Sequence, residues 1–436
     1  MLIKNAEVNG ECVDVRIDGG RIAEIGQGLK ASGASFDAGG HALLPGLHDH
    51  HIHLNACAAA MNSVRCGPPE VRSKAELIEA LHGAGGTDML RGVGYHQSVA
   101  GEIDRDWLDE HGPKRPLRIQ HRSGRLWILN SLAMDAFEIS TPKDGRLLDS
   151  DTRLRRAARF PDLKPLISKL TSYGLTGVTE VTPSNGIAEY ENYIKNAVPL
   201  RLNIMGKAEL SGLDAPYIGP LKLHYHDHNL PALDDLRAEI EGAHQAGRAV
   251  AAHCVTRAEL MLTLAAIEEA GVHKGDRIEH AAIADEAAIE WMARLGVTVV
   301  TQPNFITERV DAYRKDVPRD DHPHLWRLRS FIEAGLNCAA GSDAPFGDPN
   351  PWAAMAAAVS RPVGFEQEAI SPEAALGLYT KPADDASAPP RRVEVGELAD
   401  LCLIDRSWTK ARDDLAAVNV KATWIGGKQA CELKPK

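Results

Sequence analysis

The sequence predicts a (β/α)8 TIM barrel with a small β-sandwich domain, formed by both chain termini, and an insertion after barrel strand 1. Three observations lead to this prediction. Short apolar runs alternate with amphipathic stretches through most of the 436 residues. Both ends contain short apolar runs separated by glycine turns, and a long segment separates the first two barrel strands.

The alternating region supplies the barrel. Strands that alternate with helices imply parallel βαβ units, and eight such units form a barrel whose active site lies at the carboxyl ends of the strands. The expected strands span residues 42–54, 177–182, 200–207, 220–226, 249–255, 277–282, 297–302 and 337–343. Helices that bury one face against a sheet are expected over residues 232–246, 258–270, 285–295 and 325–334.

The two ends of the chain predict one small domain. Short strands are expected at residues 2–8, 12–17, 21–25, 399–404 and 422–425. Neither end could bury a core alone, so we expect residues 1–44 and 392–436 to pair as a β-sandwich beside a barrel of residues 45–391. Residues 56–160 are too long for an ordinary strand–helix connection, and we expect them to form a lid over the barrel mouth.

The composition restricts the class of protein. There are 49 Lys and Arg against 60 Asp and Glu, a formal charge of −11, so neither nucleic acid nor an anionic membrane is an expected partner. No apolar run approaches the roughly 18 residues of a membrane helix. Seven cysteines without a CxxC pair, and a start without the apolar core of a secretory signal, predict a cytoplasmic protein.

The strongest local signal is the segment PGLHDHHIHL at residues 45–54. Residues two apart on a strand face the same side, so His51 and His53 can bind one metal ion together. His48 and His50 share the opposite alternation, and the spacing leaves open which pair faces inward. A polar surface cluster is the less favoured alternative, because an apolar strand rarely ends in four histidines.

Three further polar residues, His253, His280 and Asp343, end later strands of the predicted barrel. Taken singly, each is more typical of a satisfied buried polar residue than of a metal ligand. Because they are expected at the same ends of different strands, together they predict a site for zinc or a similar divalent ion.

Several short motifs occur in a fixed order along nearly the whole chain. They are residues 45–54, RIEHA at 277–281, GSDAP at 341–345, LRGVGY at 90–95, WILNS at 127–131 and GELADL at 396–401. As a set they resemble the metal-dependent amidohydrolase superfamily, and within it the YtcJ-like (amidohydrolase 3) branch. The D-x-H-x-H pattern of this family selects Asp49, His51 and His53 and sets His48 and His50 aside.

The resemblance also implies how metal is held. Two zinc ions are expected per chain, and the implied ligands are His51, His53 and Asp343 for one ion and His253 and His280 for the other. Lys222 is implied to be a carboxylated lysine, formed with CO₂, that bridges the two ions. Burial favours the neutral amine that reacts with CO₂. Without the resemblance, a lone lysine on an apolar strand would indicate an edge residue.

Four residues are candidates for substrate binding. His224 and His226 share the alternation of Lys222, and Tyr95 ends one of the matching segments. Where relatives have Asp-Gly-His, this chain has Ser123-Gly124-Arg125, and a guanidinium there suits a carboxylate or phosphate of the substrate. A surface salt bridge is an equally weighted alternative for Arg125.

Together these residues predict a hydrolase that cleaves the C–N bond of an N-acyl, N-substituted or cyclic amide, with a carboxylate on the substrate if Arg125 contacts it. Lys222 and Asp343 are the expected catalytic residues: a hydroxide on the metals attacks, and Asp343 acts as base and proton carrier. A decarboxylase or isomerase on the same metals, and a catalytically silent binding barrel, are the alternatives. The expected partners are a small amide substrate and further copies of the chain in a homo-oligomer, a dimer.

Overall fold

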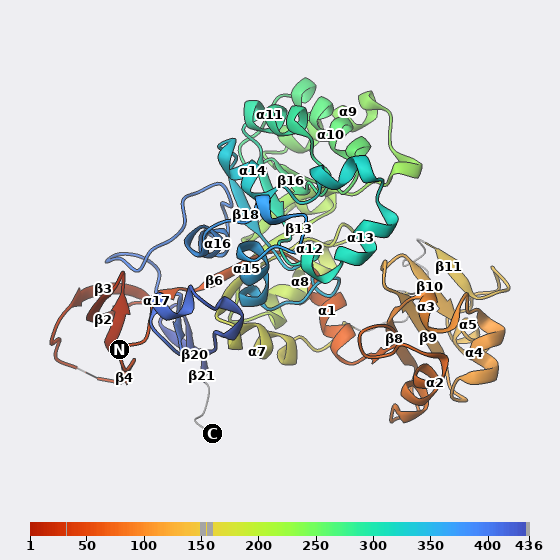
Figure 1. Cartoon of the computed structure of the whole chain (residues 1–436), viewed down its shortest axis with the longest axis horizontal. Coiled ribbons are helices and arrows are strands. Elements are labelled where there is room, and N and C mark those ends of the chain that lie inside the picture. The colour runs from red at the N-terminus through yellow and green to blue at the C-terminus, as the bar shows by residue number, and fades with distance from the viewer. Residues whose placement is uncertain (32, 149–153, 155–159, 433–436) are drawn as a thin grey trace. The chain divides into compact units, whose positions relative to one another are not determined.

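The computed structural model describes residues 1–31, 33–148, 154 and 160–432. The chain forms two compact units, residues 1–54 with 164–436 and residues 55–163. The larger unit contains an eight-stranded sheet and two four-stranded sheets, and the smaller unit contains a five-stranded sheet (Figure 1).

The eight-stranded sheet of the larger unit is a parallel barrel. Its strands follow one another around the sheet in chain order, and a parallel bridge between Ile52 and Ala344 joins the last strand to the first. The strands are β6 (Leu47–Ile52), β12 (Leu175–Glu180), β13 (Arg201–Gly206), β14 (Ile218–Leu223), β15 (Val250–Cys254), β16 (Arg277–His280), β17 (Thr298–Thr301) and β18 (Cys338–Ala340). The predicted (β/α)8 barrel is confirmed.

Helices follow the strands and pack one face on the barrel. The main ones are α7 (Lys164–Ser172), α8 (Ile187–Asn196), α9 (Leu233–Gln245), α10 (Arg257–Ala270), α11 (Glu286–Leu295), α14 (Leu328–Glu333), α15 (Pro351–Val359) and α16 (Pro372–Tyr379). In α10, the Thr256 side chain caps the first turn, and the buried Leu260, Leu264 and Ile267 recur at helical spacing. The four helices predicted from such spacing, α9, α10, α11 and α14, are all present.

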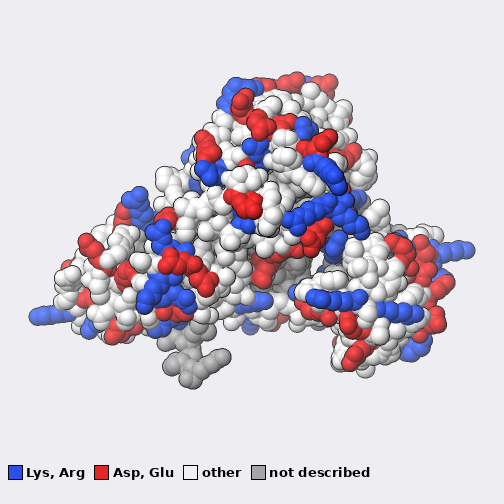
Figure 2. Space-filling view, viewed as in Figure 1, with Lys and Arg blue, Asp and Glu red and all other residues white. Residues whose placement is uncertain are grey.

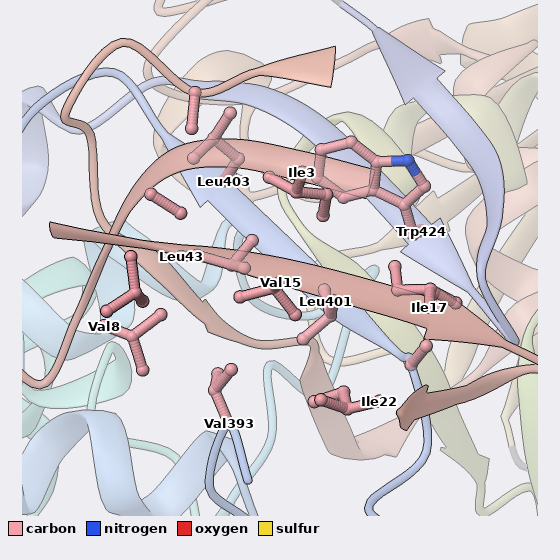
Figure 3. Packing of buried hydrophobic residues seen from close by; sticks show 14 of the residues in the cluster. Ile3, Val8, Val15, Ile17, Ile22, Leu43, Val393, Leu401, Leu403 and Trp424 are labelled. Atoms are coloured by element: carbon pink, nitrogen blue, oxygen red, sulfur yellow. The ribbon is translucent and has the colours of Figure 1, made fainter. Parts of the chain in front are cut away.

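Both ends of the chain contribute to one small β structure. One sheet consists of β1 (Leu2–Val8), β2 (Glu11–Asp18), β3 (Arg21–Gly26) and β4 (Ser35–Asp37), and the other of β5 (Leu43–Pro45), β19 (Leu401–Ile404), β20 (Val420–Ile425) and β21 (Lys428–Glu432). Ile3 and Val15 from the first sheet share a buried cluster with Leu403 and Trp424 from the second (Figure 3). This shared core explains why neither end needs a core of its own.

The apolar run at residues 42–54 is divided between two sheets. Leu43–Pro45 pairs antiparallel with β19, whereas Leu47–Ile52 pairs with β12 in the barrel. Gly46 lies at the change of direction, where an added Cβ would lie 2.2 Å from the side chain of Thr176. The single predicted strand is therefore wrong at its start, because both pieces are apolar and nothing in their alternation marks the change.

The smaller unit has its own sheet and core. Its strands are β7 (Val64–Arg65), β8 (Leu90–Tyr95), β9 (Leu117–His121), β10 (Leu126–Leu129) and β11 (Arg146–Leu148), and its helices include α2 (Lys74–Gly83), α3 (Gln97–Ala100), α4 (Arg105–His111) and α5 (Ser131–Ala136). Leu77, Leu81, Leu108 and Ile119 are fully buried in one cluster. The predicted insertion is thus a folded unit, and its role as a lid stays a prediction.

The surface in Figure 2 carries acidic and basic side chains interspersed. Among the described residues, none of the helices combines the length and the apolar character that crossing a membrane requires.

Candidate metal centre

The polar residues predicted at the strand ends lie at the carboxyl ends of the barrel strands. They are His51 on β6, Lys222 on β14, His253 on β15, His280 on β16, His53 directly after β6, and Asp343 in the loop that follows β18. This is the end of a (β/α)8 barrel at which active sites are built.

A buried group of ligands forms around Asp343. One ligand atom each from His51, His280 and Asp343 lie within 4.8 Å of one another. Oδ1 of Asp343 is 3.5 Å from Nε2 of His51 and 3.2 Å from Nε2 of His53. Imidazole nitrogens and a carboxylate oxygen that converge on one point are the donors that zinc prefers.

Each of the three histidines in this group has its Nδ1 atom beside an oxygen atom. The pairs are His51 with Glu279 at 2.5 Å, His53 with Thr182 at 2.9 Å, and His280 with Gln302 at 2.7 Å. Such partners fix the tautomer and the orientation of a metal-binding ring. The Nε2 atoms of His51 and His53 therefore face Asp343.

The backbone of two residues in the group has an uncommon conformation. His280 and Asp343 have φ angles of 70° and 54°. Residues other than glycine rarely adopt this left-handed region, which costs on the order of 1–3 kcal/mol and clusters at functional sites. At His280 it interrupts the alternation of β16, so that the neighbouring side chains of Glu279 and His280 both lie beside His51.

Asp49 joins the first and last strands of the barrel. Its Oδ1 accepts hydrogen bonds from the backbone N–H groups of His51 and Ser342, each 3.0 Å long, and its Oδ2 accepts one of 2.6 Å from the Ser342 hydroxyl. A Cβ on Gly341 would lie 2.4 Å from the His51 nitrogen, so this close approach requires glycine. Asp49 therefore positions His51 and Asp343.

Two buried polar atoms at the centre have no hydrogen-bond partner among the described residues. They are Nζ of Lys222 and Oδ1 of Asp343, the latter close to two ring nitrogens without a well-aligned hydrogen bond. Leaving such atoms unpaired costs about 1–3 kcal/mol each. A cation beside Asp343 and a carbamate on Lys222 would satisfy both, so the residues present fit a divalent metal centre.

Electrostatics set the charge states at this centre. Burial would raise the pKa of Asp343, but the charge of His51 and the contacts with His51 and His53 outweigh it, so the pKa lies well below its usual range. Burial lowers the pKa of Lys222, although the charge of Glu279 opposes this shift. Asp343 is therefore a carboxylate, and Lys222 is shifted toward the neutral amine that can react with CO₂.

A second group of histidines adjoins the buried one. Ligand atoms of His224, His226 and His253 also lie within 4.8 Å of one another. The ring of His253 lies between the groups, with centroid distances of 4.3 Å to His224 and 4.6 Å to His280. Because β14 ends at Leu223 and not at residue 226, His224 and His226 lie in the loop that follows the strand.

Comparison with known proteins decides the family. The model of a family described as the amidohydrolase family matches residues 35–431. The chain belongs to this family. The resemblance seen in the motifs is thus confirmed, and the protein is an enzyme, a metal-dependent amidohydrolase.

Individual relatives agree with this assignment. The amidohydrolase is 24% identical to an N-substituted formamide deformylase of Arthrobacter pascens, across 98% of its own chain and 96% of the relative. It is 29% identical to YtcJ of Bacillus subtilis strain 168, which is named as a candidate amidohydrolase, across 33% of its own chain and 29% of that protein. Its fold is similar to that of an uncharacterised metal-dependent hydrolase of Pyrococcus furiosus, with a TM-score of 0.75, 21% identity, and coverage of 93% and 98% of the two chains.

Two predicted substrate contacts of the amidohydrolase belong to its smaller unit. Tyr95 is buried at the end of β8, and its hydroxyl donates a 2.7 Å hydrogen bond to the carbonyl of Gly101. Arg125 is half-buried in the turn between β9 and β10. A substrate contact for either residue stays a prediction.

A cavity of about 740 Å³ lies at the opposite, amino-terminal end of the amidohydrolase barrel. Residues at or near the start of strands line it, among them Arg201, Gly219, Arg277 and Thr298. His48, whose Nε2 lies 2.9 Å from the Thr179 hydroxyl, also lines this cavity and lies outside both ligand groups. Since barrel enzymes carry their chemistry at the carboxyl ends of the strands, this cavity is not the expected place of catalysis.

Glu279 is the main site residue that the sequence-based prediction missed. It is fully buried, with Oε1 2.5 Å from Nε of Arg277 and Oε2 2.5 Å from Nδ1 of His51. The signal was present, because Arg277 and Glu279 are two apart on one predicted strand and so face the same side. A buried acid and base at that spacing predict an ion pair beside the site.

The change Glu279→Gln is expected to lower the free energy of unfolding by about 3–5 kcal/mol, because Arg277 is then buried without a charge partner. Urea unfolding measures the loss. Glu286→Gln is the control, since Glu286 pairs with Arg327 but its side chain is 70% exposed. Its loss is expected to stay below about 1 kcal/mol, and losses of equal size would contradict the role of burial.

The stability of the metal-free amidohydrolase is expected to fall as the pH is lowered from 7 to 5. Burial lowers the pKa of His280 to about 3 and those of His48, His50 and His253 well below 6.5. These rings stay neutral when folded, whereas the unfolded chain takes up protons below pH 6.5, so protons favour unfolding in this range.

The size of this effect follows from the shift. For His280 alone the loss between pH 7 and 5 is about 2 kcal/mol. Two groups act in the opposite direction: His51, whose pKa is raised by the charge of Glu279 against the effect of burial, and Asp49, whose pKa burial raises to about 6. Urea unfolding at pH 7 and pH 5 measures the net change in the free energy of unfolding. A protein that is more stable at pH 5 would contradict the prediction.

Proposed function

We propose that this amidohydrolase hydrolyses the C–N bond of a small amide at a centre of two divalent cations, with zinc as the expected metal. The observation that carries the proposal is that two buried atoms, Nζ of Lys222 and Oδ1 of Asp343, lack a hydrogen bond among histidines at the carboxyl end of the barrel. The first cation would be held by His51, His53 and Asp343, with His280 beside them. A carbamate on Lys222 would extend from this cation to a second one next to His253.

The residues of the chain have distinct tasks in this reaction. Divalent cations, when bound, polarise a carbonyl group and lower the pKa of water. Asp343, ionised and at the centre, accepts a proton from the attacking water and passes it to the leaving nitrogen. A new bond forms between the water oxygen and the acyl carbon, the C–N bond breaks, and the products are a carboxylic acid and an amine.

The neighbours of the histidines preserve this geometry. Glu279, Thr182 and Gln302 hold the Nδ1 sides of the three rings, so that the Nε2 sides stay directed at the centre. Of these three partners, Glu279 is the one held on both sides by charged or ring nitrogens, from Arg277 and from His51.

The first substrates to consider are N-substituted formamides and other N-acyl amines. The support is the relative named N-substituted formamide deformylase, whose similarity extends over 98% of this chain at 24% identity. Cyclic amides form the next class, because the same bond is broken.

A substrate screen tests the proposal. Purified, zinc-loaded protein is incubated with N-formyl amines, N-acyl amino acids and cyclic amides, and amine release or ring opening is measured. We expect turnover of at least one N-formyl or N-acyl amine, loss of turnover with a chelator, and recovery with zinc. Release of CO₂ or formation of an isomer, with no amine released, would contradict hydrolysis.

A further inference from the structure

Three histidines at the edge of the barrel mouth face one another. The ring centroid of His224 is 4.6 Å from that of His226 and 4.3 Å from that of His253. The centroids of His226 and His253 are 6.0 Å apart. The three rings are close to perpendicular, with interplanar angles of 71°, 71° and 83°. They are therefore not a stack, and one ligand atom from each lies within 4.8 Å of the others.

The fold brings these residues together from two neighbouring elements. Strands β14 and β15 are parallel, and Leu223, the last residue of β14, is paired with Ala252. His224, the first residue after β14, therefore lies next to His253 on β15. His226 follows two residues after His224, with an extended backbone (φ −125°, ψ 155°) that keeps the two on one side. Two histidines at this spacing, with a third from the adjacent strand, form a pattern typical of metal ligands.

Packing alone does not explain the arrangement. His224 is exposed and His226 and His253 are half-buried, so the rings fill no closed core. Among the residues that the structure describes, the rings of His224 and His253 have no hydrogen-bond partner. Asp227, the acid next to His226, accepts a hydrogen bond of 2.5 Å from the Thr256 hydroxyl.

We propose that His224, His226 and His253 bind one divalent cation directly. This inference rests on the proposed metal-dependent function and adds ligands of the second cation that the motifs do not imply. Ligand nitrogens around a tetrahedral zinc ion with bonds of about 2.0–2.1 Å lie about 3.4 Å apart, so small rotations of these three side chains close the site. Three histidines leave one position of a tetrahedral zinc ion for a further ligand, and a carbamate on Lys222 would fill it.

The site explains why two histidines follow Lys222 in the loop directly after β14. A carbamate on Lys222 reaches the second cation from inside the barrel, and His224 and His226 reach it from the loop above. His280 then belongs with His51 and Asp343, as their ligand distances indicate. His224 and His226 are thus metal ligands in this proposal and not substrate contacts.

Zinc content of purified full-length variants tests the assignment. Wild type, His224→Ala, His226→Ala and His228→Ala are loaded with zinc, dialysed and analysed for metal, and thermal unfolding checks the fold. His228 is the matched control, since it is exposed and its ring lies parallel to His226 at 5.7 Å but outside the ligand group. We expect about two zinc ions in wild type and His228→Ala and about one in the other two variants.

The outcomes separate this inference from the proposed function. Two zinc ions retained in both His224→Ala and His226→Ala would overturn the three-histidine site and leave the hydrolase proposal intact. One zinc ion in wild type would overturn the inference too and leave a single-cation hydrolase. No bound zinc in wild type would contradict the proposed function itself. If one variant fails to fold, the other gives the decision.

Discussion

Replacement of Asp343 by asparagine is expected to reduce kcat by about 10²–10⁴-fold while KM changes little. The carboxamide has nearly the same shape, but it cannot take a proton from water at neutral pH. The low pKa of Asp343 keeps the wild-type group ionised, so the loss should persist across the neutral range. Steady-state kinetics on the best substrate from the screen measure the effect, with zinc content determined in parallel.

The control for this change is Asp348→Asn. Asp348 lies in an exposed loop, where its side chain accepts a hydrogen bond from the backbone of Asn350. Its replacement is expected to leave kcat unchanged. An Asp343→Asn variant that keeps its turnover rate and loses substrate affinity would show that Asp343 acts in binding or structure and not in proton transfer.

Replacement of Lys222 by alanine is expected to reduce activity by about 10²-fold or more, because the proposed carbamate bridge between the two cations cannot form. Nζ of Lys222 makes no hydrogen bond to the described residues, so the barrel should remain folded. Formate or acetate added at millimolar concentration is expected to restore part of the activity by taking the place of the carbamate.

A second buried lysine provides the control. Lys381 is as buried as Lys222, at 7% exposure, but its Nζ donates a 2.9 Å hydrogen bond to the carbonyl of Ala388. Lys381→Ala is expected to keep full activity per folded molecule and to show no response to formate. Wild-type activity in Lys222→Ala would refute the bridging role.

The barrel could be predicted because its pattern is regular. Apolar runs and amphipathic helices alternate along the barrel region, and eight such units are typical of a closed parallel barrel. Boundaries were less predictable where an apolar run serves two sheets, as in Leu43–Pro45 and Leu47–Ile52, or where a strand gives way to a loop after Leu223. The backbone hydrogen-bond partners of a residue decide where a strand begins and ends, and the sequence does not show which residues those partners are.

The candidate site was predictable wherever successive side chains alternate between the two faces of a strand. Histidines at strand ends indicated a metal centre, and the family pattern chose His51 and His53 over His48 and His50. Alternation fails at His280, whose positive φ turns its side chain to the same group as Glu279. The proximity of His280 to His51 depends on this backbone angle. It could therefore not be predicted from the sequence and is seen only in the structure.

Oxygen-18 incorporation tests hydrolysis most directly. The zinc-loaded enzyme is run in H₂¹⁸O on the best N-formyl or N-acyl amine, and the carboxylic acid product is analysed by mass spectrometry. We predict one ¹⁸O atom per acid molecule formed, at a rate that a chelator abolishes and zinc restores. Product without ¹⁸O, or labelling that continues unchanged after the metal is removed, would contradict metal-dependent hydrolysis of the C–N bond.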